Sequence, residues 1–101
     1  MLVSMKEMLA DAREKKYAIP AFDVSNYEMM RAVLETCEEE RSPALLMGLG
    51  VDLGGRGLPL ITSMVRAASD YYTVPVCFMD TNIFHSPFRM FFVGIDICRF
   101  Y

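Results

Sequence analysis

Asp80 is the residue of this chain best placed to do chemistry. It ends an apolar run at residues 75–79, with the sequence PVCFM. In α/β proteins the ligand site lies at the carboxyl ends of parallel strands, where a carboxylate can act as a general acid or base toward a hydroxyl group. The alternative is an aspartate that only begins a turn. The pattern of residues leaves both interpretations open.

Histidine and cysteine give weaker signals. His85 is the single histidine, and a metal site needs several ligands in a tight cluster, so it is expected to be a surface or packing residue. The three cysteines stand at wide spacings without a CxxC pair, which argues against a zinc knuckle or a disulfide scaffold. They are expected to be buried thiols in a reducing compartment: Cys37, Cys77 and Cys98.

Residues 48–54 (GLGVDLG) have glycines spaced much like those of a dinucleotide-binding turn. Such a turn must open directly into a helix, so that its amides and the helix dipole meet the pyrophosphate. Here residues 55–58 precede Pro59, where the helical pattern starts. The segment is therefore predicted to be a flexible loop between a strand and a helix.

Capping boxes mark the beginnings of two helices. Ser4 stands three residues before Glu7, and Ser25 three residues before Glu28, so each pair can satisfy free backbone N–H groups. Apolar residues follow each box at helical spacing. A proline is well placed as the first residue of a helix, so Pro59 indicates the start of a third.

Three β-prone segments alternate with these helices, at residues 17–24, 43–50 and 74–80. They advance by about 30 residues each, which is the rhythm of βαβ units with right-handed crossovers. Two of them are apolar without alternation, as is typical of a buried parallel sheet. The sequence therefore predicts an α/β fold, with Asp23, Leu49 and Asp80 at the strand ends.

Composition excludes several classes of protein. The chain has 101 residues, 53% of them hydrophobic, with a formal net charge of −3. An acidic chain with scattered basic residues is not expected to bind nucleic acid or an anionic membrane surface. The beginning of the chain lacks the pattern of a signal peptide, and no run approaches the ~18 apolar residues of a membrane span. A cytoplasmic protein is expected.

The first 80 residues resemble the start of the class II, metal-dependent aldolases of fructose and tagatose bisphosphates. Three segments carry the resemblance: residues 1–26 (MLVSMKEMLADAREKKYAIPAFDVSN), 28–46 (EMMRAVLETCEEERSPALL) and 72–80 (YTVPVCFMD). The resemblance implies that residues 1–80 are the N-terminal portion, about three βα units, of a (β/α)₈ barrel. Residues 81–101 are a divergent tail that the resemblance does not cover.

The family resemblance also implies a chemistry. It is a reversible aldol cleavage of the ketose bisphosphate to dihydroxyacetone phosphate and glyceraldehyde 3-phosphate, a step of carbohydrate metabolism and glycolysis, with zinc polarising the ketose carbonyl. Asp80 falls on the family's aspartate that moves a proton at the hydroxyl of the cleaved bond. Thr81 stands where the family has a zinc-ligating histidine, Leu49 where it has a serine, and Asp23 where it has an asparagine. Asp80 is thus the predicted catalytic residue, with no complete metal site and no identified substrate-binding residue.

A barrel of this type needs roughly 250 residues. The remaining zinc histidines and phosphate loops of the family would lie beyond residue 101, so the chain is expected to be a truncated, inactive fragment. Two alternatives remain open. One is a divergent aldolase-like protein with an altered metal site. The other is a non-catalytic half-barrel that associates with itself or another barrel through its open strand edges.

The tail suggests how such a chain could arise. Residues 93–100 (VGIDICRF) can be encoded by codons whose +1 frame reads LGLTSVGF, close to a stretch that the resembled family carries. We hypothesise a frameshift between Asp80 and Val93. The coding nucleotides test this directly, because the hypothesis fails if no other frame continues the family sequence.

Overall fold

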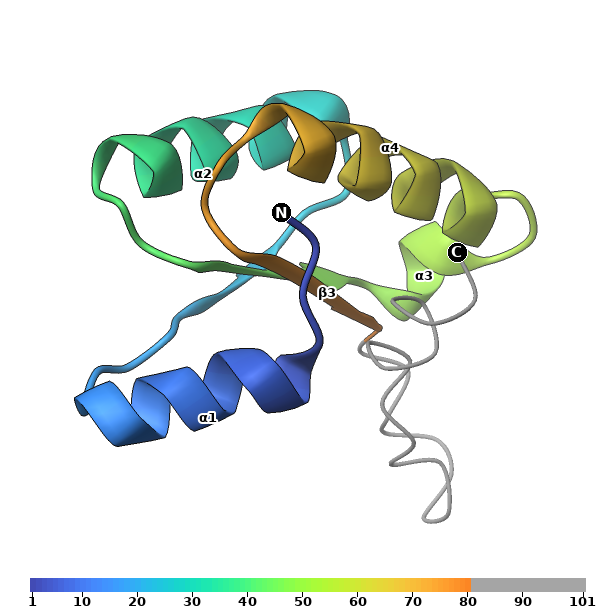
Figure 1. The fold of residues 1–101 in the computed structure, drawn as a ribbon. Helices are drawn as coiled ribbons and strands as arrows, with labels where there is room; N and C mark the ends of the chain where they lie inside the picture. The colour runs from blue at the N-terminus through green and yellow to red at the C-terminus, as the bar shows by residue number, and fades with distance from the viewer. Residues whose placement is uncertain (81–101) are drawn as a thin grey trace, which may run out of the picture.

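The computed structural model describes residues 1–80, and of Asp80 only the backbone (Figure 1). Helices and strands alternate as the sequence predicts, and the tail at residues 81–101 lies outside the described residues. The elements, in chain order, are α1 (Met5–Lys15), β1 (Ala21–Asp23), α2 (Tyr27–Glu39), β2 (Ala44–Gly48), α3 (Gly50–Leu53), α4 (Gly57–Tyr71) and β3 (Val76–Asp80).

The three strands form one parallel sheet in the order β1-β2-β3. Each crossover between neighbouring strands runs through a helix, as parallel pairing requires. Ala21 pairs with Leu45 in the first ladder, and Leu45 pairs with Cys77 in the second. The strand order therefore follows the chain order, as in the beginning of a (β/α)₈ barrel.

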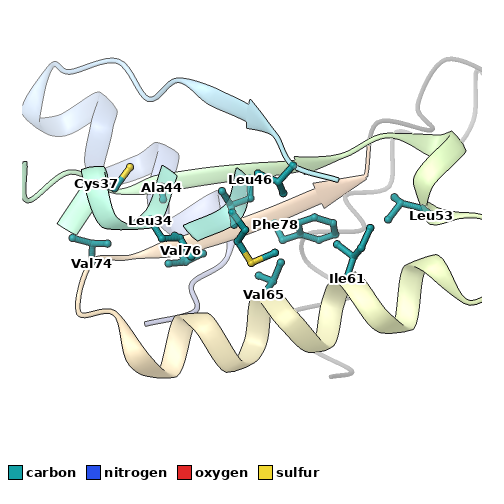
Figure 2. Packing of buried hydrophobic residues seen from close by; sticks show 12 residues of the cluster. Leu34, Cys37, Ala44, Leu46, Leu53, Ile61, Val65, Val74, Val76 and Phe78 are labelled. Atoms are coloured by element: carbon teal, nitrogen blue, oxygen red, sulfur yellow. The ribbon is translucent and has the colours of Figure 1, made fainter. Parts of the chain in front are cut away.

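Helices cover both faces of the sheet. Figure 1 shows α2 and α4 side by side on one face and α1 on the other. The larger core lies under α2 and α4, where Leu34 and Val65 pack against Leu46 and Phe78 (Figure 2). Because the sheet is buried on both faces, β2 and β3 are apolar without alternation.

The smaller core lies under α1. Met5 and Met8 of this helix pack against Leu45 of β2 and Cys77 of β3. Ser4 caps α1 as predicted. Its hydroxyl accepts from the backbone N–H of Glu7, and the Glu7 carboxylate accepts from the backbone N–H of Ser4. None of the helices in residues 1–80 has the length and apolar character needed to cross a membrane.

Two predicted boundaries are wrong. The N-cap of α2 is Asn26, whose side-chain oxygen accepts from the Met29 backbone at 2.9 Å, and not Ser25. Asparagine and serine cap helices about equally well, so the backbone path decides between neighbours. α4 begins at Gly57 rather than at Pro59, which then stands in the first turn, where a missing N–H is tolerated.

β1 is also shorter than predicted, with three residues where the sequence indicates up to eight. Pro20 directly precedes the strand and has no N–H to donate to a ladder. Residues 17–20, which lead into β1, are therefore not part of the strand. Asp23, the last residue of β1, pairs with Met47, the last but one residue of β2.

Candidate active site at the carboxyl ends of the strands

The carboxyl ends of the three strands meet at one edge of the sheet. Asp23 ends β1 in register with Met47, and Asp80 ends β3 in register with Gly48. Leu49 follows β2 directly. The predicted strand ends are therefore confirmed for Asp23 and Asp80, while β2 ends at Gly48, one residue before the predicted Leu49. Neighbouring strands lie about 4.8 Å apart, so the backbones of β1 and β3 are separated by roughly 10 Å at this edge.

Of the two aspartates that end strands at this edge, Asp23 is the one whose side chain the structure describes. Asp23 is exposed, and within residues 1–80 its side chain has no hydrogen-bond or ion-pair partner. The following residue, Val24, is buried, and its N–H donates to the Met47 carbonyl at 2.9 Å. The end of β1 is thus fixed by its backbone, while the carboxylate is left accessible to a ligand.

Gly48 brings β2 close to its neighbours just below this edge. A Cβ atom at Gly48 would lie 2.8 Å from Cζ of Phe78 and 2.9 Å from both methyl carbons of Leu53. Figure 2 shows Phe78 and Leu53 on the same side of the sheet at this end. The two side chains form an apolar floor, and only a glycine allows this approach.

The glycine-containing segment after β2 is not the open, flexible loop that the sequence predicts. Residues 50–53 form the short helix α3, in which the amides of Asp52 and Leu53 donate to the Leu49 carbonyl. Burial of Leu53 explains this helix, since the leucine closes the core under the strand ends. The signal available in the sequence was Gly48 itself, a glycine at the last position of an apolar strand.

The thiols of the described region do not contribute to this edge. Cys37 and Cys77 are both buried, which confirms the predicted burial of these two cysteines. Cys37 belongs to the core under α2 and α4, and Cys77 to the core under α1, so the sheet separates them. Burial raises the pKa of the Cys37 thiol, which keeps it protonated and unreactive.

Metal-binding side chains are not brought together in the described part of the chain. Within residues 1–80 there is no group of three His, Cys, Asp or Glu side chains that could hold a metal ion. The candidates Thr81, His85 and Cys98 lie outside the described residues. The donors present therefore do not fit a zinc ion by themselves, and no chemical step is derived through zinc below.

Comparison with known proteins decides the family. The family model described as fructose-bisphosphate aldolase class-II matches residues 3–80. This chain belongs to the class II fructose-bisphosphate aldolase family. The "probable fructose-bisphosphate aldolase" of Bacillus subtilis (strain 168) is 44% identical over 80 residues, which cover 74% of this chain and 27% of that protein.

A solved aldolase supports the fold of this family member. The crystal structure of the YdjI aldolase of Escherichia coli K12 matches with a TM-score of 0.71 at 30% identity, over 80% of this chain and 32% of that one. The chain thus spans about a quarter to a third of the aldolases that it matches. Its three parallel strands and their helices are a partial aldolase barrel.

Proposed function

We propose that residues 1–80 supply the first strands of the active site of a class II ketose-bisphosphate aldolase, with Asp80 as its acid/base residue. The observation that carries the proposal is that the family match runs through Asp80, and that this residue ends β3 at the edge where such barrels bind ligands. The substrate would be fructose or tagatose bisphosphate, and the products dihydroxyacetone phosphate and glyceraldehyde 3-phosphate.

The role proposed for Asp80 is one proton transfer. In the cleavage direction its carboxylate accepts the proton of the hydroxyl beside the bond that breaks, the hydroxyl oxygen becomes the aldehyde oxygen, and the electron pair of the C–C bond moves toward the ketose carbonyl. In the synthesis direction the same group returns the proton. In the resembled family a zinc ion polarises that carbonyl. Replacing Asp80 in an intact barrel that contains residues 1–80 tests this assignment, as designed in the Discussion.

We further propose that the 101-residue chain alone does not cleave the sugar. The support is the share of its relatives that it spans, and Thr81 at the position of a family zinc ligand. Purified chain would be assayed for bound zinc and for dihydroxyacetone phosphate formation from either ketose bisphosphate. We expect neither stoichiometric zinc nor turnover. One bound zinc with cleavage that Asp80→Asn abolishes would instead establish a divergent, active aldolase.

A second candidate function is a non-catalytic half-barrel that associates through its strand edges. The observation that favours it is the position of β1, because among residues 1–80 no strand pairs with its outer edge. Unpaired edges are templates for pairing with another chain. Amide hydrogen exchange of Ala21–Asp23 would then slow as the protein concentration rises. Exchange that does not depend on concentration would exclude pairing through β1.

The reducing cytoplasm is the proposed compartment. The odd number of cysteines, at wide spacings and without a CxxC pair, supports it, since cysteines of secreted proteins are commonly paired in disulfides.

A further inference from the structure

The α-amino group of Met1 is bound at the end of α4. Its ammonium nitrogen donates to the carbonyl oxygens of Ser69 at 2.8 Å, Tyr72 at 3.0 Å and Val74 at 2.9 Å, an arrangement that we call the N-terminal anchor. An ammonium has three N–H donors, so each of them has a carbonyl acceptor. The last carbonyls of a helix have no partner within the helix, and the negative end of the helix dipole favours a cation. The charged N-terminus therefore completes hydrogen bonds that α4 leaves open.

Glu38 of α2 binds the same turn through its other backbone groups. Its carboxylate accepts from the N–H groups of Thr73 at 2.9 Å and Val74 at 3.0 Å. The turn between α4 and β3 thus has N–H groups on a carboxylate and carbonyl groups on an ammonium. Hydrogen bonds to ionised groups are roughly twice as strong as those between neutral groups. The position of this turn, after which β3 begins, is therefore set in part by the charge on Met1.

The N-terminal anchor also places residues 1–3 against the start of β3. Leu2 forms a parallel bridge with Val76, and Figure 1 shows the N-terminal segment passing beside β3. The Val76 N–H donates to the Met1 carbonyl at 2.7 Å, and the Val3 N–H donates to the Val76 carbonyl at 2.8 Å. β3 is therefore paired at its first residue on the edge opposite β2, and this pairing begins at the residue that carries the ammonium.

We propose that the α-amino group of Met1 is a modification site, at which an acyl group releases residues 1–3 from the start of β3. Acylation by a thioester deprotonates the ammonium to the amine, joins its nitrogen to the acyl carbon, breaks the C–S bond and releases a thiol with a second proton. The amide that results has one N–H and no charge, so two of the three carbonyls lose their donor.

The acyl group also needs space that the N-terminal anchor does not leave. Its carbon would lie about 1.33 Å from the nitrogen, among carbonyl oxygens that are now 2.8–3.0 Å from that atom. The anchor is at the beginning of β3, whereas the candidate active site is at its end. The proposal therefore does not depend on the aldolase assignment.

Full chains that differ only at one amine test the proposal. Cys37 permits chemical ligation of synthetic residues 1–36 to expressed residues 37–101, so the sequence stays unchanged. One chain carries a free Met1 amine, a second an acetylated one, and a third a free Met1 amine with an acetylated Lys6. Circular dichroism establishes which of these chains are folded.

Hydrogen exchange of individual backbone amides is the measurement. Acetylation of Met1 is expected to speed exchange of the Val3 and Val76 amides roughly tenfold or more, since both hydrogen bonds belong to the segment that the anchor holds. Acetylation of Lys6 is the matched control, because Lys6 is an exposed residue of α1, and it should leave both rates unchanged.

A fourth chain, in which hydrogen replaces the α-amino group of Met1, separates the lost hydrogen bonds from the added bulk. It has neither donor nor acyl group at this position, and the Val3 and Val76 amides should again exchange roughly tenfold faster or more. This chain decides the test if the acetylated chain does not fold. Unchanged rates in it overturn the proposal, because they would show that the ammonium does not hold the segment. Equal acceleration by acetylation of Lys6 also overturns it.

Discussion

Single residues at the carboxyl ends of the strands decide what this edge of the sheet can do. Asp80 ends β3 and Asp23 ends β1, so two carboxyl-bearing residues belong to one edge, about two strand spacings apart. Thr81, where the resembled family has a histidine, offers a hydroxyl, and protein zinc sites use imidazole, thiolate or carboxylate ligands. Under the proposed function, Asp80 would move the proton, while Thr81 differs from the histidine of the resembled family.

Gly48 is predicted to resist substitution, because its Cβ position is occupied by buried side chains of the core. In Gly48→Ala the new methyl group would meet the buried ring of Phe78 at 2.8 Å and the methyl carbons of Leu53 at 2.9 Å. Forcing a carbon into a packed core lowers the free energy of unfolding by about 1–3 kcal/mol. Urea denaturation measures this loss, and it should appear as a lower midpoint with an unchanged slope.

Gly54→Ala is the matched control for Gly48→Ala. Gly54 has a φ of −63° and no atom within 4 Å of its Cβ position. An alanine there is tolerated and restricts the unfolded chain, so the free energy of unfolding should rise by about 0.4–1 kcal/mol or stay the same. Equal losses in the two variants would contradict the close approach of β2 to Phe78 and Leu53.

Helices and strands were predictable in kind and order, and less so in their boundaries. The apolar runs fixed β2 and β3, because a strand buried on both faces has no other pattern. The cap of α2 and the length of β1 depend on the path of the backbone, which local residues do not determine alone. α3 was not predicted, because burial of Leu53 against β2 and β3 is a tertiary effect. The Asp80 side chain and the tail are outside the described residues, so the catalytic role stays a prediction.

Replacing the cap of α2 tests this boundary directly. Asn26→Ala removes the oxygen that accepts from the Met29 N–H at 2.9 Å, and this should lower the free energy of unfolding by about 1 kcal/mol. Ser25→Ala removes only a contact with the Met29 sulfur, and the loss should stay within about 0.5 kcal/mol. Thermal unfolding compares the two variants. A larger loss in Ser25→Ala would show that the helix begins one residue earlier.

Glu38, near the end of α2, forms hydrogen bonds with the segment that precedes β3. Its carboxylate accepts from the backbone N–H of Thr73 at 2.9 Å and of Val74 at 3.0 Å, and from the Thr73 hydroxyl. The hydrogen bond from the Thr73 side chain is the main cause that lowers the pKa of Glu38 below its ordinary value of 4.5, and the Val74 backbone contributes next. The folded state therefore favours the ionised form of the Glu38 carboxyl group.

This lowered pKa predicts how stability depends on pH. The contribution of Glu38 is present above pH 4.5 and is lost as the pH falls through the lower pKa of the folded state. Glu38→Gln should therefore unfold at a lower temperature at pH 7 and lose less stability than wild type on acidification below pH 4.5. Glu39→Gln is the control on the exposed side of the same helix. Parallel curves for wild type and Glu38→Gln would contradict the role of this carboxylate.

For the whole molecule, the described residues form part of an aldolase barrel. The sheet order and the match to a solved aldolase establish the partial barrel. The complete active site could not be predicted from this sequence, because the chain matches only 27% of the Bacillus aldolase and 32% of the solved one.

The cleavage rate of a chimeric barrel tests the central claim most directly. Residues 1–80 would replace the matched 80 residues of the Bacillus aldolase, whose own sequence then continues the barrel. We predict cleavage of the ketose bisphosphate, a loss of about 10²–10⁴ in kcat for Asp80→Asn, and retained activity for Asp23→Asn, which restores the family's residue. A folded, active chimera whose kcat is unchanged by Asp80→Asn would contradict the assignment of Asp80 as the acid/base residue.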